Sequence, residues 1–373
     1  MKILFYFSDW GANIIRREQN TYGGVGYYRI IKPSQQVKGH EVTVVGQELT
    51  KKGETPEERW ERIFKEYDVF WCSYFSDPKE ASAMFYMRDK YKKKVVIDVD
   101  DNFLDVLESH PLYDKLKGGK RDKAFMTTIL SFADVIVTST EPLKQRFRKH
   151  FKEVQKLDKN IVVLPNMNDI TEWNFPFTPK NTDKIVIGYA GSNSHQDDLA
   201  MFMPNLLKIM RKYKTVYFES IGSISSKDLH MFKDFSSHEM NRCDLLPATW
   251  TFKEYPEMLS KLKWDIAVCP LVDNKFTRCK SHIKFLEMSS INTPVICSRV
   301  YPYFMDIKGK RVVEHNKTGL LVKPSEWFNA LETLVLDKQK RITLAENARK
   351  HIEETWQYNG SNMSQIIDEI LAL

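Results

Sequence analysis

Short apolar runs alternate with longer stretches of helical periodicity along the whole chain. This alternation is typical of βα units, because strands that pair in parallel need a long crossover between them. In the first half we expect strands at Lys2–Phe7, Glu41–Val45, Asp68–Cys72, Lys94–Val99, Val135–Thr138 and Asn160–Leu164. Helical patterns lie between these strands, near residues 25–38, 56–66, 78–92, 120–132 and 141–157.

The alternation starts afresh after residues 171–180, TEWNFPFTPK, which contain two prolines and no periodicity and are predicted to be a linker. Strands are then expected at Lys184–Tyr189, Thr215–Ile221, Ala248–Phe252, Ile266–Pro270, Thr293–Ser298 and Gly319–Val322. Helices are expected near residues 196–213, 255–262, 280–290, 325–335 and 338–356. The fold class is therefore α/β, with one doubly wound domain over residues 1–170 and another over 181–345. Such folds bind ligands beyond the carboxyl ends of their strands, so we expect the functional residues in a cleft between the domains.

Composition and charge exclude several classes of protein. Hydrophobic residues make up 42% of the 373, which is enough for large cores and excludes a disordered chain. No apolar run approaches the ~18 residues of a membrane span. The opening MKILFYF meets Ser8 and Asp9 at once, unlike a signal peptide. The net charge of +7 is spread almost evenly, so neither half is a basic nucleic-acid module.

The cysteines indicate a reducing compartment, and we expect a cytoplasmic protein. They form no C-x-x-C pair and no even framework, which argues against a disulfide scaffold and against a structural zinc site. The five are Cys72, Cys243, Cys269, Cys279 and Cys297.

Two glycine-containing turns are candidate phosphate cradles. Gly23 and Gly24 precede a predicted helix, where glycines let the backbone approach a phosphate and the helix N-terminus supplies unpaired N–H groups. The turn is not a G-x-G-x-x-G motif, and an ordinary flexible loop is the alternative. In the second half a strand runs into Gly191 and Ser192, with His195 before the next helix. That histidine is placed either to donate to a phosphate or to cap the helix.

The segment RCKSHIKFLE carries the densest set of candidate side chains. Lys280, Lys284 and Glu287 are spaced i, i+4 and i+7, so on a helix they share one face. Two lysines at a helix start suit a diphosphate, and a glutamate beyond them suits ribose hydroxyls. A solvated helix face is the alternative interpretation.

Carboxylates follow the strand in KKVVIDVDDN. Asp100 and Asp101 stand at its end, where a functional role is favoured over a simple turn with capping aspartates. A magnesium site of the D-x-D kind is one possibility, because Mg²⁺ uses one or two carboxylates together with substrate phosphates.

One helical stretch carries a basic stripe. Residues 144–159 contain seven basic and two acidic residues. Such a pattern is usually a solvated face, but it is also the best local footprint for a polyanion in the chain. The stripe consists of Lys144, Arg148, Lys152 and Lys156.

Together these segments resemble the GT-B fold glycosyltransferases, specifically the retaining family 4 type, along nearly the whole chain. The matching segments, in order, are GGVGYYRIIKPSQQVKGHEVTVV, LPNMND, IGYAGSNSH, KFLEMSSINTPVICS, TGLLV and AENARKHIEETWQY. The resemblance implies two Rossmann-like domains that face each other across a cleft. It also implies a C-terminal helix within residues 346–373 that crosses back to the first domain.

The resemblance implies a nucleoside-diphosphate sugar donor bound mainly by the second domain. By position, Glu287 would bind the ribose, and Gly24 and Ser192 the diphosphate, with Gly23, Gly191 and His195 beside them. Lys280 and Lys284 would stabilise charge on the departing diphosphate, while Asp100 and Asp101 would lie near the acceptor. No metal and no cofactor are expected. Cys279 stands where the family's E-x7-E motif has its first glutamate, which puts the usual sugar-hydroxyl contact in doubt.

Three alternatives remain open at this point. An inactive nucleotide-sugar or polyanion-binding module would explain the missing glutamate. A Rossmann oxidoreductase is disfavoured because no G-x-G-x-x-G follows the first strand. For the enzyme, the acceptor is a saccharide, lipid or protein hydroxyl, or a hydroxymethylated base in DNA.

The Lys-rich, Gly-poor composition is typical of bacteriophage proteins, and some phage GT-B enzymes glycosylate DNA. For DNA the basic stripe would contact phosphates, together with Lys92–Lys94 and Lys117–Arg121, and a base flipped out of the duplex would stack on first-domain aromatics. The candidate aromatics are Tyr74, Phe75, Phe103 and Tyr113. We expect a monomer or a weak dimer.

Overall fold

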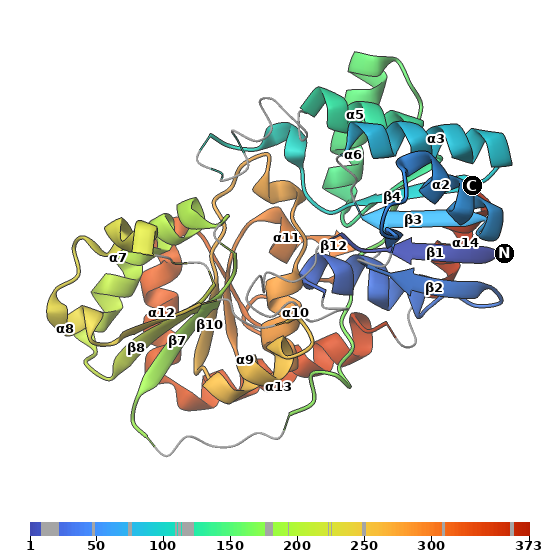
Figure 1. Ribbon diagram of the computed structural model, residues 1–373. Coiled ribbons are helices and arrows are strands. Elements are labelled where there is room, and N and C mark those ends of the chain that lie inside the picture. The colour runs from blue at the N-terminus through green and yellow to red at the C-terminus, as the bar shows by residue number, and fades with distance from the viewer. Residues whose placement is uncertain are drawn as a thin grey trace.

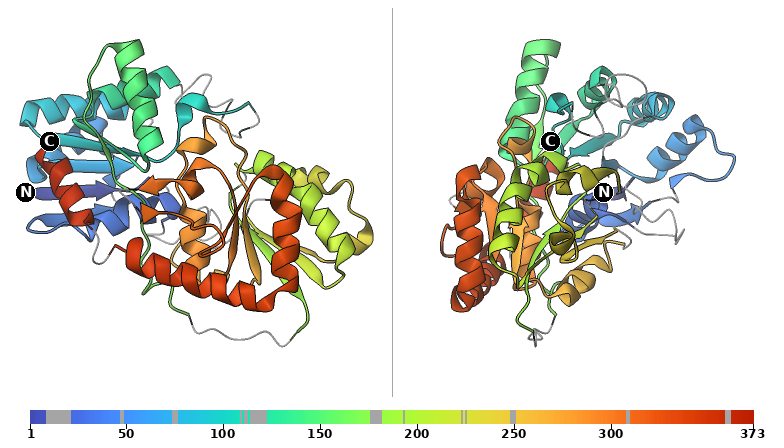
Figure 2. Two further views of the ribbon diagram at one scale, coloured as in Figure 1. Left: turned by 180° about the vertical axis from the view of Figure 1, so that it is seen from behind. Right: turned by 90° about the vertical axis from the view of Figure 1, so that its left-hand side faces the viewer.

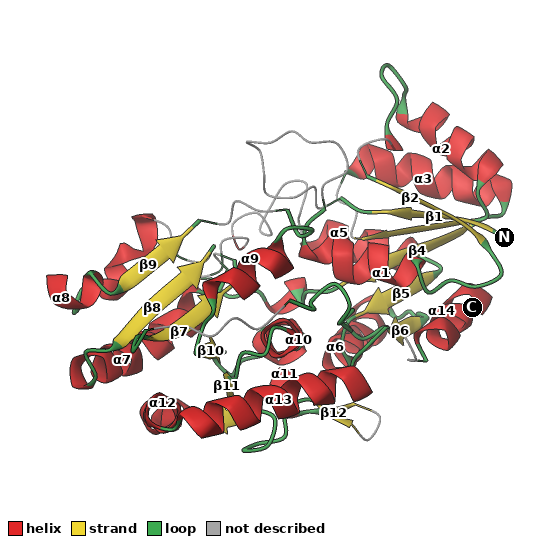
Figure 3. Cartoon of the chain, turned by 90° about the horizontal axis from the view of Figure 1, so that it is seen from below, coloured by secondary structure: helices red, strands yellow, loops and turns green. Residues whose placement is uncertain are grey.

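The chain folds into two α/β domains that stand side by side in the computed structural model (Figure 1). Each is built on a six-stranded parallel sheet with helices on both faces, as the view from below makes plain (Figure 3). The structure describes residues 1–8, 22–46, 49–73, 77–108, 110, 113, 123–175, 182–192, 194–222, 224, 226–247, 251–307, 310–358 and 362–373.

The sheet of the first domain has the strand order β2-β1-β3-β4-β5-β6. Its strands are β1 (Lys2–Tyr6), β2 (Glu41–Val45), β3 (Val69–Ser73), β4 (Lys94–Val99), β5 (Val135–Thr138) and β6 (Ile161–Val163). A π-helical turn (Gly26–Ile31) continues into α1 (Lys32–Ser34), and the other helices are α2 (Pro56–Glu66), α3 (Pro78–Tyr91), α5 (Lys123–Phe132) and α6 (Glu141–His150). Shorter pieces are a 3₁₀ turn (Phe103–Asp105) and a second π-helical turn (Phe151–Gln155).

Both faces of this sheet are buried, which explains why its strands are apolar throughout rather than alternating with polar residues. Leu4 and Phe70 pack with α2, α3, α5 and α6 on one face. Ile3, Phe5 and Trp71 pack on the other face, against the first π-helical turn and the C-terminal helix. Successive side chains of a strand point to opposite faces, so one short apolar run serves two cores.

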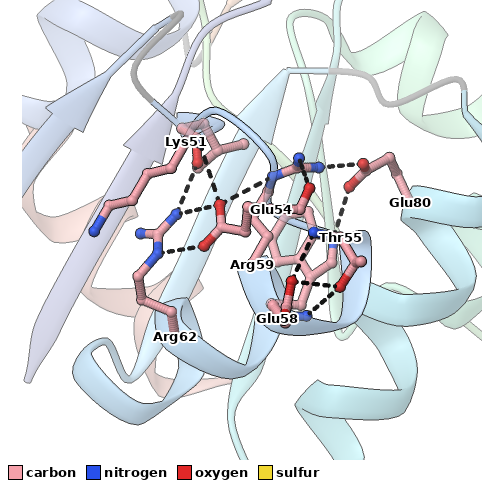
Figure 4. A network of polar contacts seen from close by, with 9 residues as sticks. Lys51, Glu54, Thr55, Glu58, Arg59, Arg62 and Glu80 are labelled. Carbon is pink, nitrogen blue, oxygen red and sulfur yellow. Dashed lines mark hydrogen bonds and ion pairs between the residues drawn. The ribbon is translucent and has the colours of Figure 1, made fainter.

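A polar network fixes α2 against α3 at the edge of this domain (Figure 4). The α2 cap is reciprocal, because Thr55 accepts from the backbone N–H of Glu58 while the Glu58 carboxylate accepts from that of Thr55. Arg59 pairs with Glu80 of α3, and Arg62 donates twice to Glu54. The network is structural and lies away from the cleft.

The sheet of the second domain has the order β14-β11-β10-β7-β8-β9. Its strands are β7 (Ile185–Ala190), β8 (Val216–Ile221), β9 (Cys243–Leu246), β10 (Ile266–Cys269), β11 (Val295–Ser298) and β14 (Leu320–Val322). The helices are α7 (Gln196–Lys212), α8 (Ser237–Met240), α9 (Tyr255–Leu262), α10 (Ile283–Ser290), α11 (Tyr301–Phe304), α12 (Trp327–Leu336) and α13 (Lys338–Thr355). There are also 3₁₀ turns at Ser226–Phe232, Thr277–Cys279 and Pro324–Glu326, and a small hairpin of β12 (Asp306–Ile307) and β13 (Lys310–Arg311).

The strand order of the second sheet predicts where a ligand binds. The chain moves outward from β7 to β8 and β9, then returns to the other side of β7 for β10, β11 and β14. This is the doubly wound Rossmann order, and its switch point lies between β7 and β10. Ligands of such sheets bind outside the carboxyl ends of the strands at that point.

The end of the chain returns to the first domain (Figure 2). Helix α13 packs on the second domain, and the backbone of Trp356 and Tyr358 then bonds to Asn168. Helix α14 (Met363–Ala372) places Ile366 and Ile370 in the core of the first sheet. The predicted crossing segment is thus two helices rather than one.

Three predicted elements differ from the structure. The helix expected at 280–290 begins at Ile283, after a 3₁₀ turn. The strand expected at 248–252 is absent from the described residues of that range, and the third strand is instead β9. The predicted linker contains Trp173, which is fully buried because its large apolar ring packs against Phe252 and Tyr255. Residues 176–180 of that linker lie outside the described residues. None of the helices that the structure describes is both long and apolar enough to cross a bilayer.

Candidate functional site

A pocket of about 430 Å³ lies where the carboxyl ends of the two sheets face each other. Ten of the residues predicted from the sequence line it together. They are Gly23, Gly24, Asp100, Asp101, Gly191, Ser192, His195, Lys280, Lys284 and Glu287. The four residues of the basic stripe are not among its lining residues.

Lys284 lies at the bottom of the pocket, in the first turn of α10. Its ammonium group lies 3.2 Å from the Tyr189 hydroxyl and 4.9 Å from the centre of that ring. Burial lowers the pKa of Lys284 to about 8, because a buried ammonium loses its hydration. Among the described residues no carboxylate is in hydrogen-bonding contact with this cation, so it gains strongly from an anionic ligand.

Gly191 makes this arrangement possible. A Cβ atom at residue 191 would lie 2.7 Å from the Tyr189 hydroxyl and 3.0 Å from the Lys284 ammonium group. Any larger residue would therefore displace the lysine. At Gly24, across the pocket, a Cβ atom would meet only the Phe252 ring at 3.6 Å, which is ordinary contact.

Lys280 reaches the pocket from a different position than the sequence predicts. It follows the 3₁₀ turn and has an extended backbone, so it does not share a helix face with Lys284 and Glu287. Its ammonium group forms a 2.7 Å ion pair with Asp101 of the other domain. Partial burial by itself raises the pKa of Asp101, but this ion pair leaves the pKa below its ordinary value. The pair ties the two walls of the pocket together.

Glu287 is buried on α10 and faces two tyrosines. The hydroxyls of Tyr28 and Tyr255 each donate to its carboxylate, over 3.3 Å. Burial raises the pKa of Glu287 to about 7, since removing a carboxylate from water disfavours its charge. The carboxylate is thus an acceptor for hydroxyl groups, which is the chemistry predicted for a ribose contact.

Asp100 directly follows β4 and lies beside a buried ion pair. Arg29 donates to both oxygens of Asp98, over 2.8 and 2.9 Å, and to Asn166 over 2.8 Å. Burial, and then the neighbouring carboxylates Asp101 and Asp98, raise the pKa of Asp100 to about 7. A carboxyl with this pKa can accept or hold a proton near neutral pH.

His195 occupies the N-cap position of α7 without a capping bond from its side chain, which removes the capping alternative. Its Nδ1 lies 2.7 Å from Asp198, whose other oxygen accepts from the Val272 backbone N–H. Burial raises the pKa of Asp198 to about 6. Burial, and then Lys284 and Lys280, hold the pKa of His195 well below its ordinary value. The tautomer of the neutral ring decides which nitrogen donates, so Nε2 serves the pocket as an acceptor in one tautomer and as a donor to a phosphate in the other.

Several lining residues were given no role by the sequence. Tyr28, Arg29, Asn166, Phe252 and Tyr255 all line the pocket. The one available signal is a lone arginine inside the apolar run YYRII, which predicts a paired buried charge. The aromatic contacts join distant segments, so periodicity could not reveal them.

Cys279 does not take the place of the missing glutamate in the pocket. It is 5% exposed and belongs to the core of the first domain, together with Phe276. Its sulfur lies 3.5 Å from the Asn102 amide, and its carbonyl accepts from the Thr140 hydroxyl. This segment of the second domain therefore anchors the two domains to each other.

The basic stripe lies on α6 and the π-helical turn that follows, away from the pocket. Lys156 follows the π-helical turn, and its ammonium group donates to the carbonyl of Glu153 within that turn. Lys144, Arg148 and Lys152 form no hydrogen bond or ion pair with side chains in the described part of the chain. Thr140, the N-cap of this helix, contacts the segment that carries Lys280.

Other residues predicted to contact DNA, both lysines and aromatic residues, have partners within the protein. Lys93 pairs with Asp68, and Lys94 donates to the carbonyl of Leu371. Phe103 is buried in the core, where its ring packs on Phe147, so it is wrong as a stacking platform. The Tyr113 hydroxyl donates to Glu108. Tyr74, Phe75 and residues 117–121 lie outside the described residues.

The carboxylates of this pocket lie beside a cation of the chain itself. Asp101 is paired with Lys280, which occupies the position of a cation beside the carboxylates. In the part of the chain that the structure describes, no three His, Cys, Asp or Glu side chains come together as candidate ligands.

Comparisons with known proteins agree on the architecture. The structure of Anabaena HepE in complex with UDP and glucose superimposes with a TM-score of 0.64 at 14% identity, over 100% of this chain and 99% of that one. A glycosyltransferase from Rickettsia africae gives 0.62 at 13% identity, over 99% and 97%. The chain has the GT-B fold.

In sequence, the chain is 33% identical to D-inositol 3-phosphate glycosyltransferase of Corynebacterium jeikeium over 89 residues. This match covers 23% of the chain and 20% of that enzyme. No protein-family model matches the chain. The likeness in structure thus extends over the whole GT-B fold, and the likeness in sequence over one short segment.

Proposed function

We propose that the protein is a glycosyltransferase that moves a sugar from a nucleoside-diphosphate sugar to a hydroxyl acceptor, with retention at the anomeric carbon. The observation that carries this proposal is that Lys284 and Glu287, both on α10, line the same interdomain pocket. The cation suits a diphosphate, and the carboxylate suits ribose hydroxyls. UDP is the nucleotide we propose, because HepE, which shares the fold, was solved with UDP and glucose.

The chemistry follows from what each group offers. In glycosyl transfer the bond between the anomeric carbon and the diphosphate oxygen breaks, and negative charge develops on the departing diphosphate. Lys284 and Lys280 line the pocket, and α7 and α10 begin at its lining. These two cations and the N-terminal N–H groups of the two helices are the groups that we propose to stabilise that charge. Preorganised cations and dipoles stabilise the transition state without reorganisation at the moment of reaction.

The first-domain wall suits the acceptor. Asp100 lies across the pocket from the lysines, and its raised pKa lets it orient an acceptor hydroxyl as a hydrogen-bond partner. We propose metal-independent transfer, because Lys280 and Lys284 supply the positive charge. Five free cysteines agree with a reducing compartment, and we propose the cytoplasm.

For the acceptor we propose a hydroxymethylated base in DNA, as in the DNA-modifying enzymes of bacteriophages. Support comes from Lys144 and Arg148 on α6 and from Lys152 on the π-helical turn that follows it. Thr140, the N-cap of α6, donates to the Cys279 carbonyl, next to Lys280 of the pocket wall. A duplex whose phosphate backbone lies along this helix would approach the pocket from the side of Thr140 and the segment that carries Lys280. Each neutralised phosphate would add to the salt dependence of binding.

The test combines binding with turnover. The protein is titrated with UDP and then incubated with labelled UDP-sugars and one acceptor at a time, namely hydroxymethylcytosine duplex, oligosaccharide, lipid and peptide. We expect UDP binding and label on the DNA at low salt, with the donor's anomeric configuration kept in the product. UDP binding without hydrolysis or transfer would favour an inactive binding module. Transfer only to a sugar, lipid or peptide would end the DNA assignment and keep the enzyme.

A further inference from the structure

A second cavity, of about 560 Å³, lies on the far side of α11 from the candidate active site. Tyr303 of this one-turn helix lines the first pocket, and the next residue, Phe304, lines the second. The helix therefore forms a wall between them. A ligand in the second cavity would not reach Lys284 or Glu287, so the cavity is a separate site rather than an extension of the first.

Positive charge converges on this cavity from separate parts of the chain. Arg299 follows β11, Arg311 ends the β12–β13 hairpin, and Lys340 lies in the first turn of α13. Within the described residues, the side chains of these three form no hydrogen bond and no ion pair. Like charges that share one hollow repel each other, and a bound anion removes that cost.

Within the described residues, Glu326, the one acidic residue of the lining, forms no ion pair with these three cations. Glu326 accepts from the backbone N–H of Lys323 and so caps the 3₁₀ turn before α12. The nearby Glu314 is paired with Lys317. His315 accepts from the Leu321 backbone N–H at Nδ1, which leaves its Nε2–H as a further donor at the cavity.

The rest of the lining is suited to a sugar ring. Phe304 is 42% exposed and offers an apolar face, against which the C–H side of a ring packs. Asn316, Asn329 and Thr333 bring amides and a hydroxyl to the same cavity, and these match the hydroxyls of a sugar. Apolar contact plus a few directed polar groups is the usual composition of a small-molecule site.

The geometry points to a phosphorylated monosaccharide as the ligand of this second cavity. Arg299, Arg311 and Lys340 would bind the phosphoryl group, and Phe304 the ring. Guanidinium groups bind phosphate through paired N–H donors, and such charge-assisted bonds are the strong ones. This assignment depends only on the second cavity and stands apart from the proposed transfer reaction.

The experiment is a calorimetric titration of the full chain with glucose 6-phosphate, inorganic phosphate and glucose, each measured separately. We expect saturable binding of glucose 6-phosphate, with inorganic phosphate at least about tenfold weaker and glucose undetectable. Arg299→Ala and Arg311→Ala should each weaken binding about tenfold or more, because each removes a charge-assisted contact. Both side chains are exposed, so these variants are expected to fold, which circular dichroism checks.

Two controls separate this site from the first pocket. Lys261→Ala removes an exposed cation of the same domain and should leave the affinity for glucose 6-phosphate unchanged. Lys284→Ala alters only the first pocket and should also leave it unchanged. Loss of binding in Lys284→Ala, or unchanged binding in both arginine variants, would overturn the assignment. Equal affinity for inorganic phosphate and glucose 6-phosphate would overturn the sugar part of it.

Discussion

The two walls of the interdomain pocket are built from opposite chemistry. The second-domain wall presents Lys284 in the first turn of α10 and Lys280 just before that helix. Gly191 has no side chain and so leaves room for the Lys284 ammonium group. The first-domain wall presents Asp100 and Asp101 at the end of a strand. One wall is prepared for an anion, and the other for a hydroxyl or a proton.

The difference also appears in how each wall is balanced. On the first wall, Arg29 holds Asp98 in a buried pair, and Asp101 is paired across the pocket with Lys280. On the second wall, the Lys284 ammonium group contacts the hydroxyl and the ring of Tyr189 and forms no ion pair within the part of the chain that the structure describes. An ammonium group left like this is expected to gain most from a ligand, so the donor should depend chiefly on the second wall.

The largest effect is expected from Lys284→Ala. Removing a preorganised cation from the departing diphosphate should lower kcat by roughly 10²–10³. Steady-state kinetics with a UDP-sugar measure this, with Lys261→Ala as the exposed-lysine control. An unchanged kcat would show that the second wall does not stabilise the leaving group.

Glu287→Gln should act on both binding and stability. The folded protein holds a proton on Glu287 up to a pH of about 7, while the unfolded chain releases it near its ordinary value. Stability therefore falls as pH rises through that window. The glutamine variant should be more stable at pH 8 by about 1–3 kcal/mol, with no gain at pH 5.

At pH 8, where Glu287 is charged, the same variant should bind UDP about tenfold more weakly, because a charged acceptor for ribose hydroxyls is lost. Denaturant unfolding at the two pH values, together with UDP titration, measures both effects. Greater stability with unchanged UDP affinity would remove Glu287 from the donor site.

The dependence of kcat/KM on pH should report on Lys284 of the second wall. Lys284 has a pKa of about 8 and loses its charge above it, so kcat/KM should fall about tenfold per pH unit on the alkaline side. A bound diphosphate favours the charged lysine, so the fall in kcat should lie at higher pH. In Lys284→Arg the alkaline limb should disappear, since arginine stays charged. A limb that persists in this variant must come from another group.

The two glycines offer a smaller, matched comparison. Gly191→Ala places a Cβ atom against Tyr189 and Lys284, and should raise the KM for the donor about tenfold. Gly24→Ala meets only the Phe252 ring at a normal distance and should change the KM for the donor less. Equal effects of the two would mean that the diphosphate contacts both turns equally.

Much of the fold is readable from the sequence because buried parallel strands are short, apolar and separated by helices. β2, β4 and β5 coincide with the predicted ranges. The third strand of the second sheet is different, because CDLL is short and half-polar, and its pairing with β8 rather than its pattern defines it. Helix α14 lies within the crossing segment that the resemblance implies, but no range expected from periodicity includes it, because packing on the distant first sheet specifies it.

The site is readable only where a motif marks it. Lys284 and Glu287 follow from their spacing on one helix, but the position of Lys280 depends on a 3₁₀ turn anchored by Cys279 in the other domain. Tyr28 and Tyr255 reach Glu287 from 259 and 32 residues away. Contacts of this kind arise from the domain arrangement and leave no local pattern.

The most direct measurement compares donor hydrolysis with transfer in Lys284→Ala and Asp100→Asn. Hydrolysis uses water as the acceptor and so reports on the donor wall alone. The account predicts that Lys284→Ala loses hydrolysis and transfer to the same extent. It predicts that Asp100→Asn keeps hydrolysis while losing transfer. Hydrolysis that survives in Lys284→Ala, or falls equally in both variants, would contradict the division of the pocket into a donor wall and an acceptor wall.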